Sequence, residues 1–275
     1  MKKTIWGNTI VKNEGRYLWF AINSVVNYLD KILIYDTGST DDTVKIIHLL
    51  QNKYPNKILF QEMGSVDAKG LAKLRQRMLD ETKSDWLLIL DGDEVWWKKS
   101  IEETITKIKQ HGEILFALVN PVINLIGDIY HYQDESSGRY KILGQVGHLN
   151  IRAVNRKIKG LYIKKEYPLE GFYTQENKLI QDYGNDKLEF IDAPILHFSH
   201  LLRSSNSQGD RKSLNRVKKI KYELGLKFPK DFQYPEVFYQ PLPPFIVSPW
   251  QKMSKRFKFR ALLETPLRRI KRKII

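Results

Sequence analysis

The first hundred residues alternate between short apolar segments typical of β-strands and amphipathic segments typical of α-helices. The strand-like segments cover residues 4–11, 31–36, 57–63 and 85–91, and the helix-like segments cover 15–30, 40–54 and 68–83. Such alternation predicts βαβ units, which build a mostly parallel sheet flanked by helices. The expected fold class is therefore α/β. Ligands of these sheets bind beyond the carboxyl ends of the strands.

Length and composition narrow the class of protein further. A chain of 275 residues is long enough for one large α/β domain or two small ones, and its 42% hydrophobic content is that of a soluble globular protein. Cysteine is absent, which excludes a disulfide framework, a thiolate metal site and a cysteine nucleophile.

The N-terminal segment and the apolar runs bear on the expected location. The segment "MKKTIWGNTIVKNEG" lacks the apolar region of a signal peptide. No apolar run approaches the roughly 18 residues that span a bilayer. We therefore expect a cytoplasmic protein.

Positive charge is concentrated at the C-terminal end of the chain. The net charge is +15, and residues 252–275 contribute +9 of it through ten Lys or Arg and one Glu. Prolines at 235, 241, 243, 244 and 249 indicate a boundary before this tail. We expect a domain at 1–245 and a basic amphipathic tail at 246–275, which does not fit a uniformly basic nucleic-acid-binding protein.

Carboxylates follow a buried strand at "LILDGDEVWW", residues 88–97. Asp91, Asp93 and Glu94 are separated only by Gly92, and packed negative charge at the end of an apolar strand needs a reason. A tight Asp-Gly turn is one interpretation. A site for Mg²⁺ or Mn²⁺ is the other, because these cations take oxygen ligands and are shared between carboxylates and substrate phosphates.

Four motifs, carried by three segments, together resemble those of a known family. "TIVKNEGRYL" (9–18), "IYDTGSTDDT" (34–43) and "LRQRMLDETKSDWLLILDGDE" (74–94), the last ending in a DxD motif, occur in the order seen in family 2 glycosyltransferases with the GT-A fold. The first segment is similar to the opening of the bacterial branch that includes lipopolysaccharide-core glucosyltransferases. The resemblance thins after about residue 100.

The resemblance implies roles for particular residues. Asp36 would accept a hydrogen bond from the nucleotide base, and Arg75 would meet the nucleotide from the third helix. Asp93 would be the main metal ligand, with Asp91 near the ribose and the metal. The remaining residues expected to bind the donor are Thr9, Ile10 and Val11, which would line the base pocket, and Glu14, for which a structural role bonding backbone amides is the alternative.

The acceptor hydroxyl needs a general base. Glu170 and Glu166 lie four residues apart in "KKEYPLEGF", and Glu170 aligns better with a glutamate of the family, although Leu169 replaces the histidine that usually precedes it. The alternative for either glutamate is a solvated partner of Lys164 or Lys165.

Histidines and cations in the second half of the chain are further candidates. His197 follows a strand in "ILHFSH" and is expected to be a metal ligand, in keeping with the late histidine of many GT-A enzymes. In an extended segment His200 would point to the other face. Arg203, Lys212 and Arg216 could reach a diphosphate, or could belong to a solvated basic helix over 211–224.

The tail has an apolar period of three to four residues. The members are Trp250, Met253, Phe257, Ala261, Leu267, Ile270 and Ile274, with Lys and Arg between them. Pro266 is expected to break this stripe into two short helices. A basic amphipathic segment is typical of a helix lying on an anionic membrane surface, here over residues 250–275. Packing on the domain's own surface is the alternative.

These expectations lead to one functional hypothesis with rivals. The chain is expected to be a metal-dependent, inverting glycosyltransferase using Mn²⁺ or Mg²⁺. It would move a sugar from a nucleotide-diphosphate donor, with a UDP-sugar favoured, to a glycan or lipid-linked acceptor at the inner face of the membrane. The alternatives are a sugar nucleotidyltransferase, or a non-catalytic protein that binds nucleic acid or membrane. No nucleic-acid partner is expected, since acids at the strand ends would repel phosphates unless a cation intervened.

Overall fold

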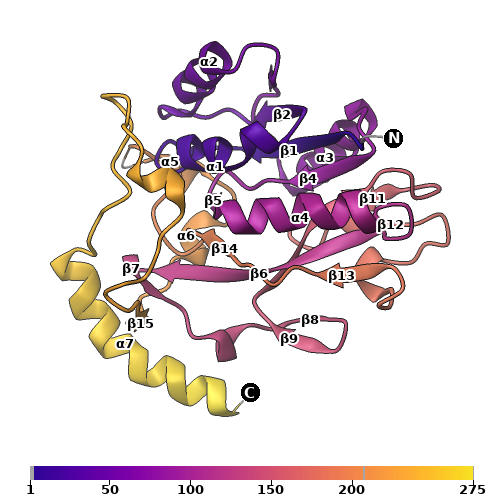
Figure 1. Ribbon diagram of the computed structural model, residues 1–275. Coiled ribbons are helices and arrows are strands. Elements are labelled where there is room, and N and C mark those ends of the chain that lie inside the picture. The colour runs from indigo at the N-terminus through magenta and orange to yellow at the C-terminus, as the bar shows by residue number, and fades with distance from the viewer. Residues whose placement is uncertain (1–2, 207, 275) are drawn as a thin grey trace.

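A computed structural model of the chain describes residues 3–206 and 208–274. Within these residues, an 11-stranded sheet crosses the molecule, with helices on both of its faces (Figure 1). The main path of strands is β15-β7-β6-β10-β4-β1-β2-β3, while β13 and β14 pair with β6, and β5 pairs with β14. Two separate hairpins, β11-β12 and β8-β9, lie beside it.

The elements have the following bounds. The helices are α1 Leu18–Val25, α2 Thr43–Lys53, α3 Ala68–Glu81, α4 Lys98–His111, α5 Gly209–Lys212, α6 Arg216–Lys219 and α7 Lys255–Ile274. Short 3-10 helices are η1 Val26–Tyr28, η2 Glu135–Ser137, η3 Ile180–Asp182 and η4 Glu236–Tyr239. The strands are β1 Ile5–Val11, β2 Lys31–Asp36, β3 Ile58–Glu62, β4 Trp86–Ile89, β5 Glu94–Trp96, β6 Ala117–Ile126, β7 Asp128–Tyr132, β8 Tyr140–Ile142, β9 Gln145–Gly147, β10 Leu149–Asn155, β11 Tyr162–Lys164, β12 Gly171–Tyr173, β13 Leu188–Phe190, β14 Ile195–His197 and β15 Leu226–Lys227.

The first four strands form the parallel part that the alternating pattern predicts. β1 pairs in parallel with both β2 and β4, and β2 pairs in parallel with β3. The side chains of β2 alternate between the two faces of the sheet. Ile32 and Ile34 join the large core with α1, α2 and α4, whereas Leu33 and Tyr35 pack with Met78 of α3. The prediction of an α/β fold with helices flanking a parallel sheet is confirmed.

Beyond β4 the sheet becomes mixed. β10 runs antiparallel to both β4 and β6, and β6 runs antiparallel to β7. β6 also pairs in parallel with β13 and β14. These pairings join segments far apart in sequence.

Two predicted helical features are wrong. The basic helix expected over 211–224 is replaced by the short helices α5 and α6, which a turn separates at Ser213 to Asn215. Asn215 has a left-handed φ of 55°, which interrupts a helix because right-handed φ values propagate it. Conversely, α7 continues through Pro266 rather than dividing there.

The C-terminal helix α7 lies along the margin of the molecule (Figure 1). Ala261 and Thr265 on one side of α7 are buried against the domain, so part of this helix packs on the chain's own surface. Upstream of α7, Ile246 and Trp250 pack with the large core. No helix within residues 3–206 and 208–274 is long and apolar enough to cross a membrane. The division into 1–245 and 246–275 remains a prediction.

Candidate functional site

The carboxyl ends of β1, β2 and β4 meet at one edge of the sheet because these strands are parallel neighbours. After β4 the chain makes a turn in which the Glu94 amide donates to the Asp91 carbonyl at 3.1 Å. We call residues 91–94 the acidic turn. A Cβ at Gly92 would lie 2.9 Å from Glu14 Cγ, so glycine allows this turn to pack against the segment that follows β1.

β5 brings a histidine to the acidic turn. β5 starts at Glu94 and pairs antiparallel with β14, with His197 opposite Glu94. His197 Nε2 lies 3.2 Å from Asp93 Oδ2, and its Nδ1 lies 3.6 Å from Glu94 Oε1. His200 faces elsewhere, with Nδ1 2.8 Å from the Lys219 carbonyl oxygen.

Arginines neutralise the buried carboxylates. Arg152, on β10, contacts Glu94 and lies 3.0 Å from Asp91 Oδ2. Arg203 contacts Asp93 through Nη1. Asp93 and Glu94 are therefore members of buried ion pairs, which depend on one another because an unpaired buried charge is costly, whereas the side chain of Asp91 is 33% exposed.

Glu14 joins the same network from the loop after β1. Arg203 Nη1 lies 3.4 Å from Glu14 Oε1, and Arg216 Nη2 donates to the same oxygen at 2.5 Å. Arg216 also donates to the backbone carbonyls of Lys12 and Asn13. Buried Arg203 and Arg216 thus do not belong to a solvated basic face, and they join α6 and its preceding loop to the strand ends.

The environment shifts the pKa values of the acids in opposite directions. Burial raises the pKa of Glu94 to about 7, against the lowering effect of Arg152. Burial alone would also raise the pKa of Asp93, but Arg203 and His197 hold it well below its ordinary value. For Asp91, Arg152 and Arg75 outweigh burial and lower the pKa.

The pKa values of His197 and Glu14 are raised as well. Burial would lower the pKa of His197, but the carboxylates of Asp93 and Glu94 raise it. Burial raises the pKa of Glu14 to about 7, although Arg203 and Arg216 oppose this. Of these carboxyl groups, Asp91 and Asp93 are therefore the ones that remain negatively charged at neutral pH.

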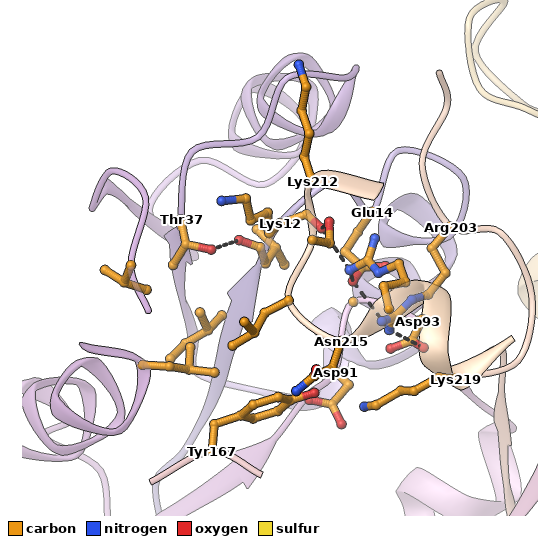
Figure 2. A pocket seen from close by; sticks show the side chains of 18 of the residues that line it. Lys12, Glu14, Thr37, Asp91, Asp93, Tyr167, Arg203, Lys212, Asn215 and Lys219 are labelled. Carbon is orange, nitrogen blue, oxygen red and sulfur yellow. Dashed lines mark hydrogen bonds and ion pairs between the residues drawn. The ribbon is translucent and has the colours of Figure 1, made fainter. Parts of the chain in front are cut away.

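A cavity of about 480 Å³ opens over these residues (Figure 2). Seven of the residues expected to bind donor or metal line it: Ile10, Val11, Glu14, Arg75, Asp91, Asp93 and His197. Cationic side chains also line it: Lys12, Arg203, Arg211, Lys212, Arg216 and Lys219. A concave surface with this many cations next to carboxylates suits an anionic ligand and a divalent cation.

A second cavity, of about 310 Å³, adjoins the first. The two cavities share Arg75, Asp91, Tyr167, His197 and Lys219. Glu170 lines only the second cavity, and its Oε1 accepts a hydrogen bond from Arg75 Nε at 3.0 Å. Glu170 therefore lies beside the shared part, whereas Glu166 is exposed and lines neither cavity.

Two of the residues expected to bind the donor lie outside the lining of the first cavity. The Asp36 carboxylate accepts from the backbone amides of Gly38 and Ser39, both at 2.9 Å, and from the Ser39 hydroxyl. Thr9 is buried at 1% exposure on β1. Contact of either residue with a nucleotide base stays a prediction.

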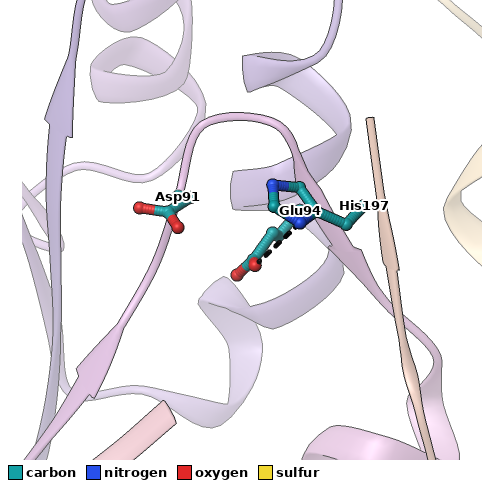
Figure 3. A group of neighbouring side chains, drawn as sticks. All are labelled: Asp91, Glu94 and His197. Carbon is teal, nitrogen blue, oxygen red and sulfur yellow. Dashed lines mark ion pairs between the residues drawn. The ribbon is translucent and has the colours of Figure 1, made fainter. Parts of the chain in front are cut away.

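Asp91, Glu94 and His197 lie close enough together to bind one metal ion. One ligand atom each from Asp91, Glu94 and His197 lies within 4.8 Å of the others (Figure 3). Glu94 Oε2 has no hydrogen-bond partner within the described residues. The two carboxylates suit Mn²⁺ or Mg²⁺, which take oxygen ligands, and the imidazole would add one nitrogen ligand. Asp93, predicted as the main ligand, instead pairs with Arg203 and His197, and its metal role stays a prediction.

Sequence reasoning did not select Arg152, Lys219 or the ligand role of Glu94, and it left Arg216 between a diphosphate contact and a solvated helix. Arg152 sits in the strand "HLNIRAVN", where a charged residue among apolar ones is the signal that could have identified it. For the cations of 211–219, the signal was only a local charge run, which is usually solvated.

The strand-end position, the acids and the surrounding cations suit a charged ligand at the edge of the sheet of an α/β protein. A family model described as glycosyl transferase family 2 matches residues 9–185, and the chain belongs to this family. The branch that contains lipopolysaccharide-core enzymes is not resolved by this match.

Similar proteins include an uncharacterized glycosyltransferase of Rickettsia felis, 36% identical over 94 residues, covering 34% of this chain and 30% of that protein. The glycosyltransferase SunS derived from a Bacillus subtilis prophage is 29% identical over 97 residues, covering 35% of this chain and 22% of that protein. The chain thus matches under a third of the length of these relatives.

Among solved structures, Staphylococcus aureus TarS 1-349 is similar with a TM-score of 0.48 and 13% identity, covering 71% of this chain and 60% of that chain. Glucosyl-3-phosphoglycerate synthase from Mycobacterium tuberculosis, solved with Mn²⁺, UDP and phosphoglyceric acid, has a TM-score of 0.46 and 15% identity, covering 73% of this chain and 72% of that chain.

Proposed function

We propose that this chain transfers a sugar from a nucleoside-diphosphate donor, a UDP-sugar, to a hydroxyl group of a glycan or lipid-linked acceptor, with inversion at the anomeric carbon. The observation that carries the proposal is the pair of adjoining cavities that share Asp91, His197 and Arg75. One cavity is rich in cations and suits the diphosphate, and the other contains a carboxylate placed for the acceptor.

Donor binding is assigned to the first cavity. Ile10 and Val11 offer an apolar wall for a base, and Arg75, Lys212 and Lys219 offer positive charge for a diphosphate. Asp91, Glu94 and His197 would hold Mn²⁺ or Mg²⁺, with Asp93 beside them. When bound, such a cation compensates the negative charge that develops on the leaving diphosphate.

The acceptor is assigned to the second cavity. Its hydroxyl oxygen attacks the anomeric carbon as the bond from that carbon to the diphosphate oxygen breaks, and the hydroxyl proton passes to Glu170. The side chain of Glu170 is 9% exposed and its Oε1 pairs with Arg75, while its Oε2 has no hydrogen-bond partner within the described residues and is placed to accept the proton. A base on the side of the anomeric carbon opposite the leaving group gives inversion.

A sugar nucleotidyltransferase is the second candidate, and the loop after β1 argues against it. Such an enzyme needs amides free to cradle a triphosphate. Here the amides of the loop are already occupied: those of Asn13, Glu14 and Gly15 donate to side chains of residues 39–43, and those of Tyr17 and Leu18 donate to the Glu14 carbonyl. A nucleic-acid-binding role would not explain why carboxylates gather in the acidic turn.

The test is a donor screen with the purified chain, Mn²⁺ and a panel of nucleotide sugars, scored by release of free nucleoside diphosphate. We expect slow hydrolysis of one donor that Asp91→Asn abolishes and that Asp186→Asn, at an exposed acid that lines neither cavity, leaves intact. Pyrophosphate release from a nucleoside triphosphate and a sugar phosphate would instead establish the nucleotidyltransferase. No turnover of any nucleotide sugar would contradict the proposal.

A further inference from the structure

The outward face of α7 carries a row of large apolar side chains. Their exposed fractions lie between 53% and 68%, and they are Phe259, Leu262, Leu263, Leu267 and Ile270, which we call the outer ridge. At about 100° per residue, all five fall on one side of the helix. An exposed contiguous apolar row on a folded protein marks an interaction surface.

The opposite side of α7 packs against the domain. Phe257 packs against Gly127, where a Cβ would lie 2.7 Å from its ring, and against the ring of Tyr222. Thr265 Oγ1 accepts from the Leu224 amide at 2.8 Å, and Arg272 makes a two-pronged ion pair with Glu223. The helix is therefore held in place with its outer ridge facing solvent.

This arrangement corrects which residues of the tail could insert into a membrane. Trp250 and Phe257 were expected to insert, but Trp250 packs on Tyr234 and Phe257 faces the domain. Of the expected stripe, Leu267 and Ile270 lie on the outer ridge. The side chain of Ile274 lies outside the described part of the chain.

Cations flank the outer ridge on both sides. By the same helical geometry, Lys258 and Arg269 lie along one flank, and Arg260 and Lys271 lie along the other. Lys258, Arg269 and Lys271 are exposed and make no ion pair with a carboxylate within residues 3–206 and 208–274. Glu264, the one acidic residue of α7, is turned toward the domain and forms ion pairs with Arg260 and Arg268.

We infer that the outer ridge docks on an anionic lipid surface, with the flanking cations at the level of the lipid phosphates. Apolar side chains between two rows of unpaired cations match a layer that is apolar inside and negatively charged at its surface. A protein partner would need acids on both sides of an apolar groove. The helix is already folded and anchored by its inner face, so docking requires no refolding of the tail.

The test uses the full chain with vesicles of phosphatidylcholine alone or mixed with phosphatidylglycerol. Leu263→Ser with Leu267→Ser removes the centre of the ridge. Ile114→Ser with Val146→Ser is the matched control, because these side chains are similarly exposed at 63% and 64% but lie away from α7. We expect wild type and the control to co-sediment with the mixed vesicles, and the ridge variant to lose roughly tenfold or more of its partition coefficient.

A second variant tests the charge. Lys258→Gln, Arg269→Gln and Lys271→Gln together should weaken binding to the mixed vesicles, by roughly fivefold for each cation at low salt. Circular dichroism and size-exclusion chromatography verify that each variant is folded and report its oligomeric state. Binding that the ridge variant retains, or wild type that ignores anionic vesicles, overturns the inference. So does a wild-type dimer that the ridge variant dissociates, because the ridge would then be covered by a second copy.

Discussion

Replacing Arg203 with alanine removes a guanidinium that contacts Asp93 and lies 3.4 Å from Glu14. Both carboxylates are buried, at 1% and 4% exposure, so neither can turn to solvent. Breaking one side of a buried ion pair costs about 3–5 kcal/mol. Glu14 can relieve part of the loss by protonation, since burial already raises its pKa to about 7. Asp93 loses the guanidinium that, together with His197, holds its pKa well below the ordinary value, so its burial is then opposed mainly by His197.

The expected result is a fall in Tm on the order of 10 °C for the Arg203→Ala variant, measured by calorimetry without added metal. Saturating Mn²⁺ should raise the Tm of this variant more than that of wild type, because a cation bound at the acidic turn supplies the missing charge. Arg256→Ala, at an exposed arginine of α7, should change neither value. A fall of less than about 2 °C, or a variant that Mn²⁺ does not stabilise, would refute the reasoning.

Three further changes test other parts of the account. Glu170→Gln should lower turnover by about 10²–10⁴-fold with little change in the donor KM, while the same change at exposed Glu166 tests the second candidate base in the same steady-state assay. Asp36→Ala should weaken UDP binding by about 1–3 kcal/mol in calorimetry. Unchanged affinity would mean that Asp36 only stabilises the turn at Gly38 and Ser39 and does not contact the nucleotide. Burial lowers the pKa of His200 to about 3 from 6.5, so the stability it contributes when neutral is lost as pH falls below 6.5. Wild type should lose about 2 kcal/mol more than His200→Gln between pH 7 and pH 5 in urea unfolding, and equal losses would contradict this.

The parallel part of the sheet could be predicted because the pattern of neighbouring residues in the sequence indicates each of its strands. Each strand of β1 to β4 lies within about two residues of an apolar segment in the sequence, and parallel pairing then places Asp91 and the loop after β1 at the same edge. The acidic turn could be identified for the same reason, as a break in an apolar run.

The partners of those acids could not be predicted, because they come from distant segments. Arg152 is 58 residues from Glu94 along the chain, and Arg216 is 202 residues from Glu14. Their positions depend on the antiparallel pairing of β10 and on the turn at Asn215, which no local period encodes. The same limit explains the tail: the apolar period predicted a helix, but which side faces the domain depends on packing against Gly127 and Tyr222.

We propose that the first cavity binds a nucleoside diphosphate together with a divalent cation at the acidic turn. Titration calorimetry of UDP with and without Mn²⁺, on wild type and on Asp91→Asn, tests this directly. We expect Mn²⁺ to tighten UDP binding by about tenfold or more in wild type, and we expect Asp91→Asn to remove this gain. UDP affinity that is the same with and without Mn²⁺, or a gain that survives in Asp91→Asn, would contradict it.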